Sequence, residues 1–207
     1  VYARAGTITL GTNESTPVVS TTTPNITGGK YGANIASSAT FNFYDGIING
    51  PLNNAIHATV SAKPTGYDVV YSYSNNIESA TLAKTADRVC RIGTKYFTSI
   101  QKAINYAGTT ESTIVMLKNV SQASTQGTIL DGQKITLDLA SYTVTTTGGG
   151  STFVNKGTFN VKGTTGKIEA TSANYAINNT GAFTLTSGTI RSTGAKNTIV
   201  NLSLIHI

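Results

Sequence analysis

The sequence predicts an all-β fold, a parallel β-helix (β-solenoid) in two units separated by a β-hairpin cap and one short helix. One observation behind this prediction is a long internal repeat, in which residues 168–199 match residues 26–56 at apolar and glycine positions. Another is a shorter period of 24 and then 22 residues, whose copies begin at Phe153, Ile177 and Ile199. Short alternating runs bounded by Gly, Thr, Ser and Asn lie between these positions, and such runs indicate strands joined by turns.

The alternation of apolar residues predicts which side chains form the core of the solenoid. Three short strands per repeat, each paired with its equivalent one coil above, bury a continuous interior, and each large side chain contributes roughly 1.5–3 kcal/mol. The residues expected to stack are Phe159, Val161 and Ile168 against Phe183, Leu185 and Ile190. The long repeat aligns Ile26, Ile35 and Ile56 with Ile168, Ile177 and Ile199. A leucine-rich repeat has a similar period but needs a Leu-rich consensus with a helical segment, which this sequence lacks.

Residues 1–63 are expected to be the C-terminal coils of a first β-helix unit. A strand is predicted around Ile8, and the Asp45 and Gly46 pair indicates a tight turn, because glycine adopts a positive φ and aspartate caps the local chain. The pattern breaks at residues 64–66. Residues 64–95 are then predicted to form a β-hairpin cap or linker, with a turn at residues 74–76.

Tyr67, Tyr71 and Tyr73 alternate along the first strand of this predicted hairpin. Two interpretations fit the pattern. The three rings are candidate glycan contacts that form a carbohydrate-stacking platform, or they cover the exposed end of the adjacent core, which a solenoid requires. Both interpretations place the rings on one face of the hairpin.

Residues 96–201 are predicted to form a second β-helix unit that begins with a short capping helix at residues 98–107. Thr98 and Ser99 suit a helix N-cap, apolar residues recur at helical spacing up to Ala107, and Gly108 ends the helix. A strand that is apolar on both faces follows at residues 113–117. Residues 202–207 depart from the repeat and are expected to be a non-native tail, so that the natural solenoid continues beyond residue 201 and the chain is a fragment.

The composition favours an uncharged, β-rich surface of the extracellular type. The 207 residues are 39% hydrophobic and only 12% charged, with no Trp. The net charge of +6 comes from scattered basic residues that lack the aromatic-and-basic pattern of a nucleic-acid module, so no nucleic-acid partner is expected. No apolar run is long enough for membrane insertion. Cys90, the single cysteine, is predicted to be a half-buried packing residue.

Three segments carry a family resemblance: residues 96–104 (YFTSIQKAI), residues 112–120 (STIVMLKNV) and residues 135–139 (ITLDL). Together they resemble the opening module of pectin-lyase-like parallel β-helix proteins, and more closely that of repetitive, adhesin-like cell-surface proteins of gut Firmicutes. Residues 40–46 and the break at residues 64–67 resemble the end of one β-helical unit in those proteins. The resemblance covers nearly the whole chain up to Asn201, and it implies a secreted bacterial protein at the cell surface.

The acidic residues are the candidate catalytic groups of this sequence. Pectin-lyase-like enzymes cluster acids on one exposed sheet, and glycoside hydrolysis needs two carboxylates roughly 5–9.5 Å apart. Asp131 and Asp138 are the closest pair here, but Asp131 precedes Gly in a turn and Asp138 alternates outward on a strand. Local turn capping and strand-edge hydrogen bonding explain them better than catalysis. Glu169 and Arg191 occupy equivalent places on successive coils and are expected to form an exposed ion pair of about 0–1 kcal/mol. No metal, nucleophile or phosphate-binding motif appears, so no catalytic residue and no cofactor is expected.

The sequence therefore predicts an extracellular structural or adhesive β-solenoid segment of a bacterial surface protein, not an enzyme. Ladders of Thr, Asn and Ser at fixed spacing are expected to bind glycans, the cell wall or host surface proteins weakly and at many points. The alternative is part of a β-helical polysaccharide lyase or glycoside hydrolase whose active site lies outside this segment. A phage tail-spike would need an apolar outer stripe, which the sequence lacks.

Overall fold

The computed structural model describes residues 1–14, 16–172, 175–194, 197–203 and 205–206. Parallel ladders of short strands stack as a β-solenoid of about seven turns, so the predicted β-helix is confirmed. The chain divides into two compact units. The first holds Val1–Arg88 and Lys95–Thr98, and the second holds Val89–Thr94 and Ser99–Ile207.

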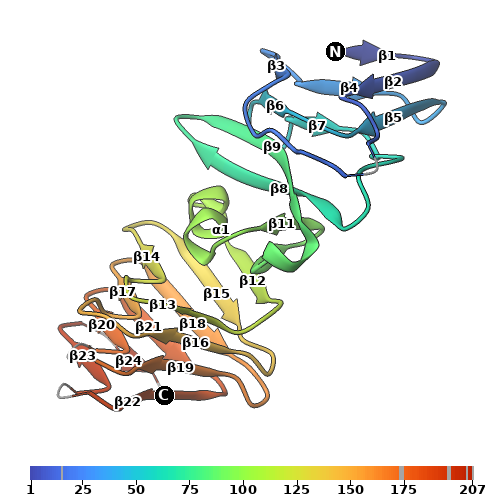
Figure 1. Cartoon of the computed structure of the whole chain (residues 1–207). Helices are drawn as coiled ribbons and strands as arrows, with labels where there is room; N and C mark the ends of the chain where they lie inside the picture. The colour runs from blue at the N-terminus through green and yellow to red at the C-terminus, as the bar shows by residue number, and fades with distance from the viewer. Residues whose placement is uncertain (15, 173–174, 195–196, 204, 207) are drawn as a thin grey trace. The chain divides into compact units, whose positions relative to one another are not determined.

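Three parallel ladders build the first unit (Figure 1, blue to cyan). Phe41 and Phe43 are two residues apart in one strand. They therefore share one face, because successive side chains of a strand point to opposite faces, and both are fully buried. The ladders are β1 (Tyr2–Ala3) with β4 (Ala33–Ile35) and β7 (Ile56–His57), β2 (Gly6–Leu10) with β5 (Ala39–Phe43), and β3 (Asn25–Thr27) with β6 (Ile47–Gly50).

The predicted turn at Asp45 and Gly46 is confirmed between β5 and β6. Gly46 has a φ of 95°, and a Cβ at this position would lie 2.2 Å from the carbonyl oxygen of Pro24, so only glycine fits. The Asp45 carboxylate accepts hydrogen bonds from the backbone N–H of Gly46 (2.8 Å) and of Ser20 (2.5 Å). The second bond ties the turn to the preceding coil.

A long antiparallel hairpin follows the parallel coils of the first unit. Its strands, β8 (Tyr67–Ser74) and β9 (Ile77–Lys84), are joined at Asn75 and Asn76, which have φ values of 51° and 62°. β9 pairs antiparallel with β6, and β11 (Lys95–Phe97) pairs parallel with β8. A 3-10 helix, η1 (Thr85–Asp87), follows β9. The hairpin therefore extends the β3–β6 ladder of the first unit.

Helix α1 (Ile100–Ala107) lies near the start of the second unit, as predicted. The Ser99 hydroxyl accepts a hydrogen bond from the backbone N–H of Lys102 (3.2 Å), and Gly108 ends the helix with a φ of 55°. β10 (Cys90–Ile92) pairs antiparallel with β12 (Ser112–Met116). The helix buries its apolar face, which includes Ile100 and Ile104.

Three parallel ladders then rise through the second unit (Figure 1, yellow to red). Each coil contributes one strand to each ladder, and the period of the sequence repeat is the length of one coil. The first ladder contains β12, β15 (Lys134–Asp138), β18 (Thr158–Lys162), β21 (Ala182–Leu185) and β24 (Ile205–His206); the second contains β13 (Val120–Gln122), β16 (Thr143–Thr146), β19 (Lys167–Ala170) and β22 (Thr189–Ser192); the third contains β14 (Gly127–Ile129), β17 (Phe153–Asn155), β20 (Ile177–Asn179) and β23 (Ile199–Asn201).

The predicted stacking is confirmed in the second unit and needs a correction in the first. The confirmed cross-strand partners are Phe159 and Phe183, Val161 and Leu185, Ile168 and Ile190, and Ile177 and Ile199. In the first unit, Ile56 pairs with Ala33 instead of Ile35. Ile35 and Ile56 are therefore not cross-strand partners as Ile177 and Ile199 are, and the alignment of these two pairs is off by two residues. A shift of two residues keeps every side chain on the same face of a strand, so the apolar pattern could not reveal it.

The last residues of the chain contribute the short strand β24. In this strand Ile205 pairs with Phe183 and His206 pairs with Thr184 of β21. Leu204 and Ile207 lie outside the described residues. The non-native origin of residues 202–207 remains a prediction.

Candidate functional site

The outward face of β15, β18 and β21 carries polar side chains in straight rows, and we call it the polar face. Thr136, Asn160 and Thr184 form its central row, because each is the cross-strand partner of the next. Alternation turns these residues outward, whereas their chain neighbours Leu137 and Phe159 are fully buried. Neighbouring strands are about 4.8 Å apart, so the row offers hydroxyl and amide groups at an even spacing.

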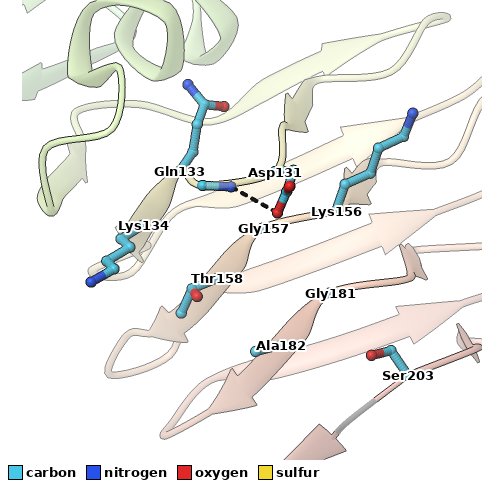
Figure 2. Close-up of a pocket in the computed structure, with 10 residues that line it drawn as sticks. Asp131, Gln133, Lys134, Lys156, Gly157, Thr158, Gly181, Ala182 and Ser203 are labelled. Atoms are coloured by element: carbon cyan, nitrogen blue, oxygen red, sulfur yellow. Dashed lines mark hydrogen bonds between the residues drawn. The ribbon is translucent and has the colours of Figure 1, made fainter.

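Two open hollows flank the polar face. The larger has a volume of about 340 Å³ and is lined by Lys134 and Thr158 of the polar face and by the turns around Asp131 and Gly157. In Figure 2 the side chains of Lys134 and Lys156 point in different directions, and Asp131 is turned toward the Gly132 N–H. The smaller hollow, of about 260 Å³, lies at the other margin beside Asp138, Lys162 and Ser187. The larger hollow therefore borders the polar rows without gathering its charged groups at one point, whereas Asp138 and Lys162 in the smaller hollow form an ion pair.

The acids nearest the polar face serve their own turns. Asp131 accepts a hydrogen bond from the backbone N–H of Gly132 (2.9 Å). Asp138 accepts one from the N–H of Ala140 (2.9 Å), and its other oxygen lies 3.4 Å from Lys162 Nζ. Turn capping was predicted for Asp131, whereas Asp138 was expected to form a strand-edge hydrogen bond and instead accepts from the turn that follows β15. In the described part of the chain, no group of three or more His, Cys, Asp or Glu side chains could hold a metal ion.

Two residues are more deeply buried than the sequence predicted. Glu169 pairs with Arg191 (2.5 Å), but its side chain is only 12% exposed against 53% for Arg191. Glu169 lies in β19 between two strands of its ladder, whereas Arg191 lies in β22, which pairs with β19. Cys90 is fully buried, because helix α1 packs on β10. Burial raises the pKa of the Cys90 thiol to about 12, so the thiol stays protonated and unreactive at neutral pH.

A ladder of asparagine side chains fills the corner between the third and first ladders. Asn155 Nδ2 donates to Asn179 Oδ1 (2.6 Å), and Asn179 Nδ2 donates to Asn201 Oδ1 (2.7 Å). Asn155 and Asn179 are fully buried, and an amide suits this position because it both donates and accepts. The sequence analysis did not assign this ladder, although an Asn closes each of the repeated phrases that begin at Phe153, Ile177 and Ile199.

Strand β8 brings the three candidate glycan-contact tyrosines to one face. Tyr67 and Tyr71 are half-buried and pack against the core of the first unit. The Tyr73 hydroxyl donates a hydrogen bond to Asn76 Oδ1 (3.3 Å). Burial, and to a lesser degree the charge of Glu78, raises the pKa of Tyr71 to about 12. This packing fits the capping interpretation, and a contact of these rings with glycans stays a prediction.

A buried ion pair beside Tyr71 was missed by the sequence analysis. Glu78 is fully buried; it accepts a hydrogen bond from the Ala55 N–H (2.9 Å) and pairs with Lys95. Lys95 Nζ lies 4.5 Å from the centroid of the Tyr71 ring. Burial lowers the pKa of Lys95, while the hydrogen bond to Glu78 acts in the opposite direction. The available signal was the place of Glu78 in β9, at an inward position in line with the buried Ala80.

Within the described residues, no helix is long and apolar enough to cross a membrane. The fold and the surfaces described above are compatible with many activities, because one fold hosts many functions. Known proteins add no identification, since no protein-family model, curated protein or solved structure matches this chain.

Proposed function

We propose that this chain is an extracellular structural and adhesive segment of a bacterial surface protein, which binds glycans or host proteins weakly and at many points. The observation that supports this proposal is the polar face, where Thr136, Asn160 and Thr184 lie in register on successive coils. A single hydroxyl or amide contact contributes only about 0.5–1.5 kcal/mol. Repetition of the contact along a repetitive ligand turns this weak interaction into avidity.

The surface composition and the family resemblance support the same setting. Only 12% of the residues are charged, so Thr, Ser and Asn supply most of the polar contacts. The resemblance of residues 96–139 to adhesin-like proteins of gut Firmicutes, within the pectin-lyase-like β-helices, favours a secreted location at the cell surface. A role without catalysis agrees with Asp131 and Asp138, whose carboxylates are used by their own turns.

A test compares the polar face with an equally polar surface of the same unit. The variant Thr136→Ala/Asn160→Ala/Thr184→Ala removes the central row, and the control Ser121→Ala/Thr145→Ala removes a cross-strand pair on β13 and β16. Beads coated densely with each protein are incubated with a panel of bacterial and host polysaccharides. We expect the first variant to lose at least about tenfold in retention and the control to retain binding. Equal retention by both variants, or cleavage of any polymer, would contradict the proposal.

A further inference from the structure

The outward face of the β1–β4–β7 ladder carries another row of side chains, in the first unit. Tyr2 is the cross-strand partner of Asn34, and Asn34 is the cross-strand partner of His57. Alternation turns all three outward, because the residues next to them in the chain are buried: Ala3, Ala33, Ile35 and Ile56. The row covers two strand spacings, about 10 Å from Tyr2 to His57, which is long enough for a disaccharide.

Arg4 and Tyr31 contact this row, and Lys30 lies over the Tyr31 ring. We call the whole set the aromatic row: Tyr2, Arg4, Lys30, Tyr31, Asn34 and His57. The rings of Tyr31 and His57 lie with their centroids 4.9 Å apart. His57 Nδ1 lies 3.2 Å from Asn34 Oδ1, and Arg4 Nε donates to the Tyr2 hydroxyl (2.7 Å). Lys30 Nζ lies 5.7 Å from the centroid of the Tyr31 ring. The aromatic rings are thus set in place by polar neighbours.

The aromatic row is open to solvent and carries positive charge. Tyr2 is 61% exposed, and His57 is exposed as well. Arg4 and Lys30 form no salt bridge within the residues that the structure describes. Their charges are therefore available to a negatively charged ligand. The polar face of the second unit differs in this respect, because its Asp138 and Lys162 compensate one another.

We propose that the aromatic row binds a sugar that carries an acidic group. The C–H face of a pyranose ring packs on the exposed ring of Tyr2 and on the His57 imidazole, because such rings present an apolar surface with a polar edge. The Asn34 amide between them donates to and accepts from the sugar hydroxyls. The Arg4 guanidinium, oriented by the Tyr2 hydroxyl, binds the carboxylate or sulfate of the sugar. This proposal rests on the proposed adhesive function, and it names a ligand class and a site for the first unit.

The ligand class can be tested with three related saccharides: sialyllactose, which carries a carboxylate, sulfated lactose, and neutral lactose. Each is titrated into the whole chain, and binding is followed by chemical shift changes or calorimetry. We expect at least one of the acidic saccharides to bind at least about tenfold more tightly than lactose, with a preference that falls as salt is added. The tighter of the two identifies the acidic group. Equal binding of all three, or no binding of any, would overturn the proposal.

The location can be tested with exposed substitutions. Tyr2→Ala and His57→Ala should each weaken binding of the preferred acidic saccharide by about tenfold, which corresponds to the loss of one stacked ring. Tyr2→Phe keeps the ring but removes the hydroxyl that orients Arg4, so only the preference for the acidic saccharide should shrink. Ile77→Ala, at another exposed apolar position of the first unit (44% exposed), is the control and should change nothing. Circular dichroism checks that each variant is folded.

These variants separate the present proposal from the proposed function. The triple variant of the polar face should bind the acidic saccharide as the original chain does, since its changes lie in the second unit. Tyr2→Ala should in turn leave retention of the polymers on the polar face intact. Unchanged saccharide binding in both Tyr2→Ala and His57→Ala would refute the aromatic row alone. Equal polymer retention by the polar-face variant and its control would refute the proposed function alone.

Discussion

The two units complete their ladders in different ways. In the second unit, strands of one coil pair in parallel with strands of the next, as β14, β17, β20 and β23 do, and the short antiparallel strand β10 pairs with β12 where the first ladder begins. In the first unit, the parallel pair β3–β6 continues into the antiparallel strands β9 and β8. An edge strand exposes unpaired N–H and C=O groups, and β9 satisfies those of β6 without another coil. In the first unit, an antiparallel strand therefore satisfies the edge of the ladder, where a regular solenoid would add another parallel coil.

The two units also differ in the groups that they bury. In the second unit the rings of Phe159 and Phe183 pack with their centroids 5.8 Å apart and their planes tilted by 47°, and the asparagine ladder is uncharged. In the first unit the Glu78 carboxylate satisfies the N–H of Ala55, and its charge is compensated by Lys95. Buried charge is stable only when it is paired. The comparison teaches that the regular coils pair their buried carboxylate, Glu169, with an exposed Arg191 at the surface, whereas the fully buried carboxylate of Glu78 lies where the hairpin interrupts the repeat.

The largest expected effect is that of removing a stacked ring from the regular unit. Phe183→Ala should destabilise the second unit by about 3–5 kcal/mol, because Phe183 is only 1% exposed and pairs with Phe159. Urea unfolding and hydrogen exchange of β18 and β21 measure the change. Thr184→Ala, the outward neighbour, should stay within about 0.5 kcal/mol. A near-neutral Phe183→Ala would contradict the coil register.

A somewhat smaller loss is expected when the charged pair of the first unit is broken. Lys95→Met should cost about 3 kcal/mol, the lower end for a buried pair, because solvent still reaches the Lys95 side chain (19% exposed). Hydrogen exchange of β8 and β9 should quicken while that of β18 stays unchanged. Adding Glu78→Met should restore part of the stability, since it removes the unpaired carboxylate. The exposed Lys84→Met is the control. Equal stability of the single and double variants would contradict the proposal that the unpaired Glu78 carboxylate causes the loss.

The asparagine ladder should contribute less than either core feature. Asn155 Nδ2 donates to both Asn179 Oδ1 and the Ala182 carbonyl oxygen. Asn179→Ala removes the first of these two acceptors in a fully buried position, so we expect a loss of about 1–3 kcal/mol. The half-exposed Asn178→Ala provides the matched control, with no measurable change. Denaturant midpoints of the two variants give the comparison directly. Equal midpoints would mean that the ladder is neutral for stability.

The smallest expected effect on stability comes from the ionisation of Cys90 and Tyr71. It is absent at neutral pH and appears only at alkaline pH. The folded pKa values of Cys90 and Tyr71 are raised to about 12 from 9.0 and 10.0. Their stabilisation is therefore complete below about pH 9 and is lost as the pH rises toward 12, with a slope of at most about 1.4 kcal/mol per pH unit for each group. In Cys90→Ala, the unfolding free energy of the second unit should decrease less steeply with pH above pH 9. In Tyr71→Phe, the unfolding free energy of the first unit should decrease less steeply above pH 10. Unfolding free energies measured between pH 8 and 11 would show unchanged slopes if these groups are not responsible.

Short-range signals explain which elements could be predicted. The helix at Ile100–Ala107 was predicted because its cap, its apolar spacing and its terminal glycine all lie within eleven residues. The turn at Gly46 was predictable for the same reason. The pairing of Ile56 with Ala33 was not, because the side chains of a strand alternate with a period of two, and a shift by two residues leaves that alternation unchanged. Loop length, which the alternation does not encode, sets the partner.

The sequence by itself determined that the chain forms short strands, that they stack as repeating coils and that Phe159 and Phe183 lie in the core. These features follow from local alternation and from a period that repeats along the chain. Only the tertiary structure decided that Glu78 meets Lys95, and that Tyr2, Asn34 and His57 form one row. Asn34 and His57 are 23 residues apart, about one coil, but the 17 residues between Glu78 and Lys95 do not match the coil period. Neither does the separation of Tyr2 from Asn34. These meetings depend on how distant strands pair. Contacts between distant strands, which no local sequence pattern specifies, produced both the buried ion pair of Glu78 and Lys95 and the aromatic row.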